Sequence, residues 1–443
     1  MTSVAENLVK HPARTPAKNP AKNPATSLVT QPKARARDPR LDFFRGVGMF
    51  IILVAHMPEN LWAEWIPARF GFSDAADLFV FCSGMASAIA FGGVFATRGW
   101  LLGAARIVHR IWQVYWAHIG SFVVVVSLAV VADRWTGTHF YVSERMGLDP
   151  FFADVQGNFA RLATLTYIPD WFDILPMYLL LLAMIPVVMA LAAVNRWLVA
   201  AFVLALWVSA NVFGVNLVAD PATSRLWYFN PLGWALIFFT GFSFMRGWLP
   251  APPVDRRLII AALVVVVVLI PPSCQVMFAC DAGGWGASLG LDSGYRTLAE
   301  WNSKTNYGPL RYLHFLATAY LAWIAVGEGG RRLSGPFTEL MRRVGQQTLA
   351  VFLTGMFMSQ ACGMLLDWLG RGFITTTAVN LFGMAVLAAA AFIVGWFKSV
   401  PWRATRPHGD QHMVQVLSPE KRPSSDPRDA RATFSRPAGE RSH

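Results

Sequence analysis

Long apolar segments, each close to the length that a lipid bilayer requires, recur along most of this chain. Hydrophobic residues make up 55% of its 443 residues and charged residues 14%, a balance far too apolar for a soluble protein of this size. The sequence therefore predicts an all-α polytopic integral membrane protein. We expect about ten membrane-spanning helices, at approximately residues 42–57, 75–96, 108–132, 173–192, 196–217, 230–248, 257–272, 309–327, 344–368 and 373–398.

The basic residues between these segments predict how the chain is oriented. They cluster in alternate linkers, which the positive-inside rule assigns to the cytoplasm. Both termini are then cytoplasmic, and the linkers at 133–172 and 273–308 face outward. The net charge of +12 is interpreted as this topology signal, not as a nucleic-acid-binding surface.

Three regions follow from composition. Residues 1–40 form a basic tail without an apolar period, residues 41–400 a transmembrane domain, and residues 401–443 a second polar tail. Such tails cannot bury a core, so both are predicted to be disordered and cytoplasmic. Cys274 and Cys280 share an outer linker and could form a disulfide there. No motif has metal-ligand spacing, so no metal and no bound cofactor is expected.

The first apolar segment carries Arg45 at its start and His56 at its end. On a helix this separation is close to three turns, so the two side chains share a face and stand roughly 16 Å apart along the axis. Ionisable groups in such a segment are costly to bury and often functional. The alternative is that Arg45 reaches the headgroups and His56 sits hydrogen-bonded at the opposite interface.

The predicted topology sorts the other polar residues into two clusters. An inner basic cluster contains Arg45, Arg106, His109 and Arg110. An outer cluster contains His56, Asp77, Asp173, Arg311 and His314.

Each cluster has a functional and a structural interpretation. Guanidinium groups at the inner face suit phosphates, although positive-inside charges collect there in any membrane protein. An outer histidine beside an aspartate suits general-base chemistry, because the carboxylate fixes the imidazole tautomer. The alternative is a buried hydrogen-bond network, and Asp173 could also be a helix N-cap.

An acyl-CoA would satisfy both clusters at once. Its phosphates would bind at the inner cluster, its pantetheine arm would follow the face between Arg45 and His56, and its thioester would lie near His56. The hypothesis is acyl transfer across the membrane to a hydroxyl that arrives from outside, with His56 removing the proton.

Two motifs resemble the membrane acyltransferase type 3 superfamily. Arg45 to His56 reads as its Arg-x10-His signature, and the run from Asp77 to Gly84 is similar to its second-span motif, Asp-Leu-Phe-Phe-Val-Leu-Ser-Gly. More narrowly, four runs over roughly residues 38–400 are similar to the OpgC family. These are His56-Met57-Pro58-Glu59, Asp173-Ile174-Leu175-Pro176-Met177-Tyr178, Trp227-Tyr228-Phe229-Asn230-Pro231 and Arg311-Tyr312-Leu313-His314-Phe315.

The OpgC resemblance implies a succinyltransferase of the bacterial inner membrane. Such proteins take succinyl groups from cytoplasmic succinyl-CoA and attach them to osmoregulated periplasmic glucans, at a site that opens to the periplasm. It implies His56 as the catalytic histidine, Arg45 as a donor-site residue and Asp77 as a supporting carboxylate. One run departs from the family pattern, since Gly-Arg-His-Ser-Leu is replaced by Gly345-Gln346-Gln347-Thr348-Leu349.

A succinyl group has a free carboxylate, which needs a cation if it is buried. Arg311 is the first candidate for this partner, followed by Arg225 and Lys304. We group the candidates for acceptor or succinyl binding as Asp173, Tyr178, Arg311 and His314, and those for donor binding as Arg45, Arg106 and Arg110.

Other functions fit the same residues. A transporter or flippase could use His56 and Asp77 as a proton relay, and an acyltransferase could act on another surface polysaccharide. Tryptophans of the outer linkers, Trp171 among them, could stack on sugars, but an interfacial aromatic belt is the simpler interpretation. The apolar outer surface would accommodate a homodimer.

Overall fold

The computed structural model describes residues 38–273, 298 and 301–402 of the chain. This part is mostly helical, with one small antiparallel sheet of β1 (Val218–Asp220) and β2 (Arg225–Leu226). Nearly all of the two predicted tails, and the pair Cys274 and Cys280, lie outside the described residues. One copy of the chain is present, so the homodimer stays a prediction.

All ten predicted apolar segments coincide with helices. They are α1 (Pro39–His56), α2 (Ala75–Arg98), α3 (Trp100–Thr136), α6 (Ile174–Val194), α7 (Arg196–Asn211), α8 (Pro231–Arg246), α9 (Arg256–Val268), α12 (Pro309–Val326), α14 (Thr348–Leu369) and α15 (Phe373–Lys398). Five of them, α2, α3, α6, α14 and α15, are long and apolar enough to cross a membrane. The number of ten spans and the cytoplasmic termini stay predictions.

Several boundaries differ from the predicted ones. The expected span at 344–368 is divided between two helices, because α13 (Pro336–Gln346) ends before Gln347 and α14 begins after it. The linker at 133–172 contains short helical pieces, which are the π-helical turn η3 (Phe140–Arg145), α4 (Asp149–Ala153) and α5 (Val155–Ala163). Short 3-10 turns follow α1 and α12; they are η1 (Leu61–Trp65), η2 (Pro67–Arg69) and η5 (Glu328–Gly330).

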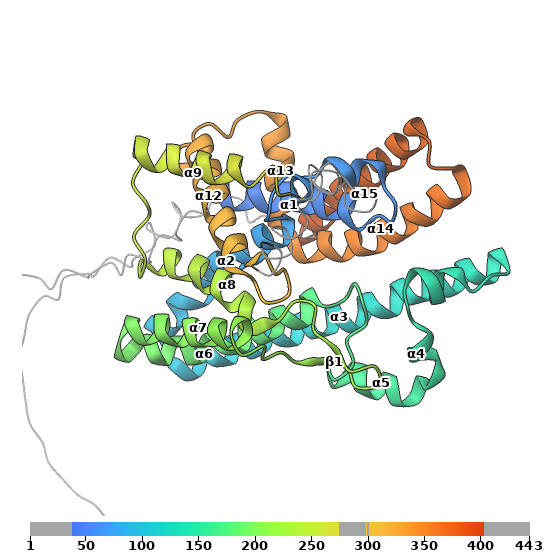
Figure 1. Cartoon of the computed structure of the whole chain (residues 1–443), viewed down its shortest axis with the longest axis horizontal. Helices are drawn as coiled ribbons and strands as arrows, with labels where there is room; N and C mark the ends of the chain where they lie inside the picture. The colour runs from blue at the N-terminus through green and yellow to red at the C-terminus, as the bar shows by residue number, and fades with distance from the viewer. Residues whose placement is uncertain (1–37, 274–297, 299–300, 403–443) are drawn as a thin grey trace, which may run out of the picture.

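The helices pack in two groups (Figure 1). Helices α1, α13, α14 and α15 lie together on one side, and α3, α6 and α7 lie on the other. Helices α2 and α8 pack against each other between these groups, and α12 packs against α9 and α2. Aromatic side chains of α8 fill the centre, where Trp234, Phe238 and Phe242 are fully buried.

Helices α1 and α13 touch through their backbones. A Cβ atom at Gly46 would lie 1.9 Å from the carbonyl oxygen of Met341, and one at Gly345 would lie 1.8 Å from that of Asp42. Any side chain at these two positions would therefore push the helices apart. The crossing holds α13 against the half of α1 that carries Arg45.

Candidate functional site

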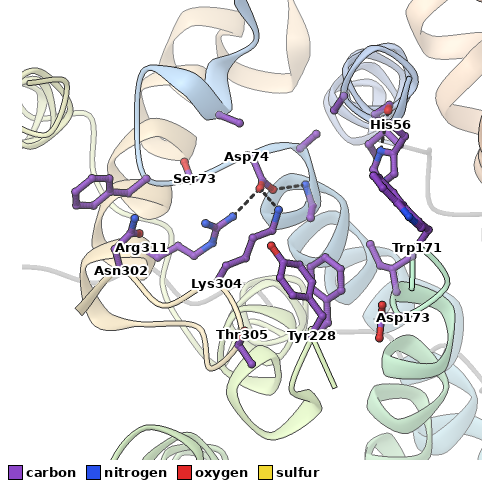
Figure 2. Close-up of a pocket in the computed structure, with 18 of the residues that line it drawn as sticks. His56, Ser73, Asp74, Trp171, Asp173, Tyr228, Asn302, Lys304, Thr305 and Arg311 are labelled. Atoms are coloured by element: carbon purple, nitrogen blue, oxygen red, sulfur yellow. Dashed lines mark hydrogen bonds and ion pairs between the residues drawn. The ribbon is translucent and has the colours of Figure 1, made fainter. Parts of the chain in front are cut away.

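A cavity of about 930 Å³ lies where the end of α1, the start of α2 and the segments before α6, α8 and α12 converge. These segments are far apart in the sequence, and each contributes polar side chains to the lining (Figure 2). The polar and aromatic side chains of the lining include His56, Ser73, Asp74, Asp170, Trp171, Asp173, Arg225, Tyr228, Lys304 and Arg311. Three members of the predicted outer cluster, His56, Asp173 and Arg311, thus share one cavity.

His56 is the last residue of α1, and its ring is held in one tautomer. Its Nδ1 atom lies 2.9 Å from the carbonyl oxygen of Ile52, one turn earlier. A carbonyl oxygen can only accept a hydrogen bond, so Nδ1 carries the proton. In the neutral ring Nε2 is then unprotonated and able to accept a proton. The ring of Trp171 packs edge-on against the imidazole, with 6.1 Å between centroids.

Asp77 contacts different groups from those that the sequence predicted. It is fully buried in the first turn of α2, where it accepts a hydrogen bond from the backbone N–H of Asp74 in a reciprocal capping box. It also binds Arg311, through Nε at 3.0 Å and Nη2 at 2.5 Å. The expectation that an aspartate fixes the histidine tautomer is therefore corrected, because Ile52 makes that contact.

The two cations near α2 share the two carboxylates. Arg311 Nη2 lies 2.9 Å from Asp74 Oδ2, and Lys304 Nζ lies 2.6 Å from the same oxygen. Burial alone would raise the pKa of Asp74, but Lys304 and Arg311 outweigh it and hold that pKa well below its usual range. For Lys304, burial opposes the charged form, and Asp74 more than compensates, so its pKa is raised. Both groups therefore stay ionised at neutral pH.

Asp173 occupies the N-cap position of α6 but makes no capping hydrogen bond with its side chain. Among the described residues its buried Oδ1 atom accepts no hydrogen bond. Arg225 Nη1 is 3.9 Å from Oδ1, and the same nitrogen is paired with Asp170 at 2.7 Å. Burial raises the pKa of Asp173 to about 7, with Arg225 lowering it and Asp170 raising it further.

Three residues predicted for the outer site, Asp77, His314 and Tyr178, do not line the cavity that the described residues form. The His314 Nδ1 atom is 2.7 Å from the hydroxyl of Ser73, so the histidine lies behind a lining residue. Tyr178 packs against Phe238 and interacts electrostatically with Arg45. Within the described part of the chain, no group of three or more His, Cys, Asp or Glu side chains could hold a metal ion.

The inner basic cluster forms only in part. The Nε atom of Arg45 is buried and has no hydrogen-bond partner among the described residues. Arg110 interacts electrostatically with Arg45 and donates a hydrogen bond to Gln113. Arg106 is exposed, with its guanidinium 5.9 Å from the ring centre of Phe91.

The comparison with known proteins decides the family. A family model described as OpgC protein matches residues 37–399, which is well over half of the chain. The chain belongs to the OpgC family. The matched range runs from the start of α1 to the end of α15, and membership of the OpgC family indicates an acyltransferase that modifies glucans. No curated protein and no solved structure matches the chain.

Sequence reasoning missed some residues at the site of this OpgC family member. Asp74 was not singled out, although the spacing of Asp74 and Asp77 at the start of an apolar segment is a capping signal. Tyr228 was noted only within a family motif. Its place in the cavity follows from the way the segment after β2 folds, and no local pattern indicates that.

Proposed function

We propose that the chain is a transmembrane O-acyltransferase that moves a succinyl group from cytoplasmic succinyl-CoA to hydroxyls of osmoregulated periplasmic glucans. In this proposal about ten helices span the bacterial inner membrane, both termini are cytoplasmic, the cavity opens to the periplasm, and the chain is a member of the acyltransferase type 3 superfamily. The observation that carries it is His56, which lines the large cavity and has its Nδ1 hydrogen committed to Ile52.

The proposed step is direct attack of a glucan hydroxyl on the thioester carbon. His56 Nε2 takes the hydroxyl proton as the new C–O bond forms. The C–S bond then breaks, and the imidazolium returns the proton to the leaving CoA thiolate. Such general-base assistance contributes roughly 10²- to 10⁴-fold, and positioning of the two substrates supplies much of the rest.

The donor head is assigned to the other end of α1. Arg45 is about three turns from His56 on α1. Its Nε–H group has no hydrogen-bond acceptor among the described residues, so it could donate to a phosphate oxygen. Arg110 of α3 adds positive charge beside Arg45, and Arg106, one turn earlier on α3, is the outer candidate for the same phosphates. The run Gly345 to Leu349 lacks the cationic pair of the family pattern, and Gln347 instead accepts a hydrogen bond from Lys398 at 2.7 Å.

Lys304 replaces Arg311 as our candidate for the succinyl carboxylate. Arg311 already directs two of its nitrogens at Asp77 and Asp74. The Lys304 ammonium has three hydrogens, its ion pair among the described residues is with Asp74 alone, and its side chain is one-third exposed. A carboxylate entering the cavity would therefore find hydrogens still available on Lys304.

Thiol release tests the proposal. Purified wild-type protein with succinyl-CoA and a glucan should release free CoA and add succinyl mass to the glucan. His56→Ala should lower the rate by about 10²-fold or more, whereas His139→Ala, a change at an exposed histidine outside the cavity, should not.

Three outcomes would overturn the proposal or one part of it. If the wild-type protein released no thiol with any glucan, the transporter interpretation of His56 and Asp77 would take its place. If thiol were released and a different surface polysaccharide gained the mass, the acceptor would change and the chemistry would stand. A fully active His56→Ala would remove the assignment of the base.

A further inference from the structure

One wall of the cavity carries aromatic rings and a carboxylate. Trp171 and Asp173 come from the segment before α6, and Tyr228 comes from the segment between β2 and α8. In Figure 2 these three lie toward His56, whereas Arg311 is on the opposite side of the cavity and Lys304 lies between. We propose that this wall is the acceptor subsite and that it binds one neutral glucose ring; this inference rests on the proposed function.

Trp171 is presented to the cavity by an unusual backbone. Its φ angle of 75° is in the left-handed region, which a bulky residue rarely adopts. Such conformations persist where the surrounding structure enforces them and often occur at functional sites. The indole is nevertheless 41% exposed, and its ring packs against His56. A sugar that stacks on the free indole face would bring its hydroxyls next to the proposed base.

Asp173 supplies an acceptor that is not satisfied within the described residues. The residue is only 4% exposed, and Oδ1 accepts no hydrogen bond there. A buried acceptor without a donor is costly, and the hydroxyl of a bound sugar would satisfy it. Arg225 does not fill this role, because it lies 3.9 Å away and is paired with Asp170.

Tyr228 is the second aromatic ring of this wall. Its ring is 47% exposed, and the Lys304 ammonium lies 5.7 Å from its centre. A phenol ring offers both an apolar face and a hydroxyl that can donate and accept. The subsite thus has two aromatic faces, one carboxylate acceptor and one hydroxyl.

The charged residues of this wall favour an uncharged sugar ring over an acidic one. Asp170 and Asp173 both line the cavity beside one cation, Arg225. An acidic sugar or a phosphate-bearing ring would not find a free cation among the described residues of this wall, because Arg225 is paired with Asp170, and the ionised fraction of Asp173 would repel it. The subsite is therefore suited to an uncharged hexose, with the succinyl carboxylate kept on the Lys304 side.

The test measures sugar binding without acyl donor. Saturation-transfer-difference NMR of a linear β-linked glucose oligosaccharide, with wild-type protein in nanodiscs, should show transfer to the sugar ring protons. Trp171→Ala and Asp173→Leu, which removes the acceptor oxygens, should each weaken binding by about tenfold, and Trp171→Phe should retain most of it. Trp368→Ala is the matched control, because that exposed tryptophan lies outside the cavity lining and should leave binding unchanged. The same oligosaccharide oxidised to carry carboxylates should bind at least about tenfold more weakly.

Kinetics separate this inference from the proposed function. With succinyl-CoA saturating, Trp171→Phe should change the KM for glucan little, and Trp171→Ala should raise it by about tenfold with a smaller effect on kcat. Unchanged sugar binding and unchanged KM in both Trp171→Ala and Asp173→Leu would overturn the subsite, even if transfer itself is active. Sugar binding that depends on Trp171 in a protein that releases no thiol would instead overturn the proposed function and leave the subsite in place.

Discussion

Arg311 and Asp77 form a buried, two-point ion pair that joins α12 to the first turn of α2. Two guanidinium nitrogens contact the two carboxylate oxygens, at 3.0 Å and 2.5 Å. The Asp77 side chain is fully buried, and that of Arg311 is 6% exposed. Because Asp77 also caps α2, the pair fixes where one wall of the cavity begins.

Removing one partner of this pair should cost more than removing both. Arg311→Met leaves a buried carboxylate uncompensated, and we expect a loss of about 3 to 5 kcal/mol in unfolding free energy. The double variant Asp77→Leu with Arg311→Met should recover part of this loss. Thermal unfolding in detergent measures both, and a double variant less stable than Arg311→Met would contradict the prediction.

The pH dependence of stability should show the raised pKa of the Asp173 carboxyl group. Its folded-state pKa is about 7, against an ordinary value of 3.8, because burial disfavours the charged form. The folded protein therefore keeps a proton that the unfolded chain releases near pH 4. Relative to Asp173→Asn, the wild-type protein should lose stability as the pH rises from about 4 to about 7 and change little above that. A Tm difference that is constant over this range would contradict the prediction.

Lys304 should decide which acyl group is preferred. Lys304→Met removes the cation assigned to the succinyl carboxylate, so succinyl transfer should fall by about tenfold or more and acetyl transfer by less. Lys304→Arg keeps the charge and should retain more of the succinyl preference. Competition between the two acyl-CoA donors, read by mass spectrometry of the glucan, gives the ratio directly. An equal loss for both donors would mean that Lys304 acts only on the structure around Asp74.

The crossing of α1 and α13 should tolerate no side chain. A Cβ at Gly345 would come within 1.8 Å of the Asp42 carbonyl oxygen, so Gly345→Ala should lower stability by about 1 to 3 kcal/mol. Gly120→Ala is the matched control, since that α3 glycine has open space at its Cβ position. The control should be neutral or stabilising by up to about 1 kcal/mol. Equal Tm values for the two variants would show that the helices move apart without cost.

The sequence predicted which residues gather at the cavity better than the direction in which each side chain faces. Apolar segment length located ten of the helices, because a bilayer sets that length, but it did not predict α13 as a separate helix. His56, Asp173 and Arg311 were expected at one depth, and all three line the cavity. Tyr178 was grouped with them through a family motif but instead interacts with Arg45, since rotation about a helix axis is set by packing partners.

The ion pair between Arg311 and Asp77 could not be predicted either, because it too depends on how distant helices pack. Arg311 was assigned to a substrate carboxylate because a buried succinyl group needs a cation, yet Arg311 is already paired with Asp77, 234 positions earlier. A free cation and a paired one look the same in a sequence. The same holds for the tautomer of His56, which depends on how the last turn of α1 places the Ile52 carbonyl.

The ion pairs that Asp74 and Asp77 form at the start of α2 also have a consequence for biosynthesis. Asp74 and Asp77 leave the ribosome long before Lys304 and Arg311, the cations that neutralise them. Until Lys304 and Arg311 have been synthesised, both carboxylates need water around them, and the first turn of α2 cannot be buried. In a nascent chain truncated between α2 and α12, the first turn of α2 would stay exposed to water, and we expect such a chain to be degraded by cellular proteases.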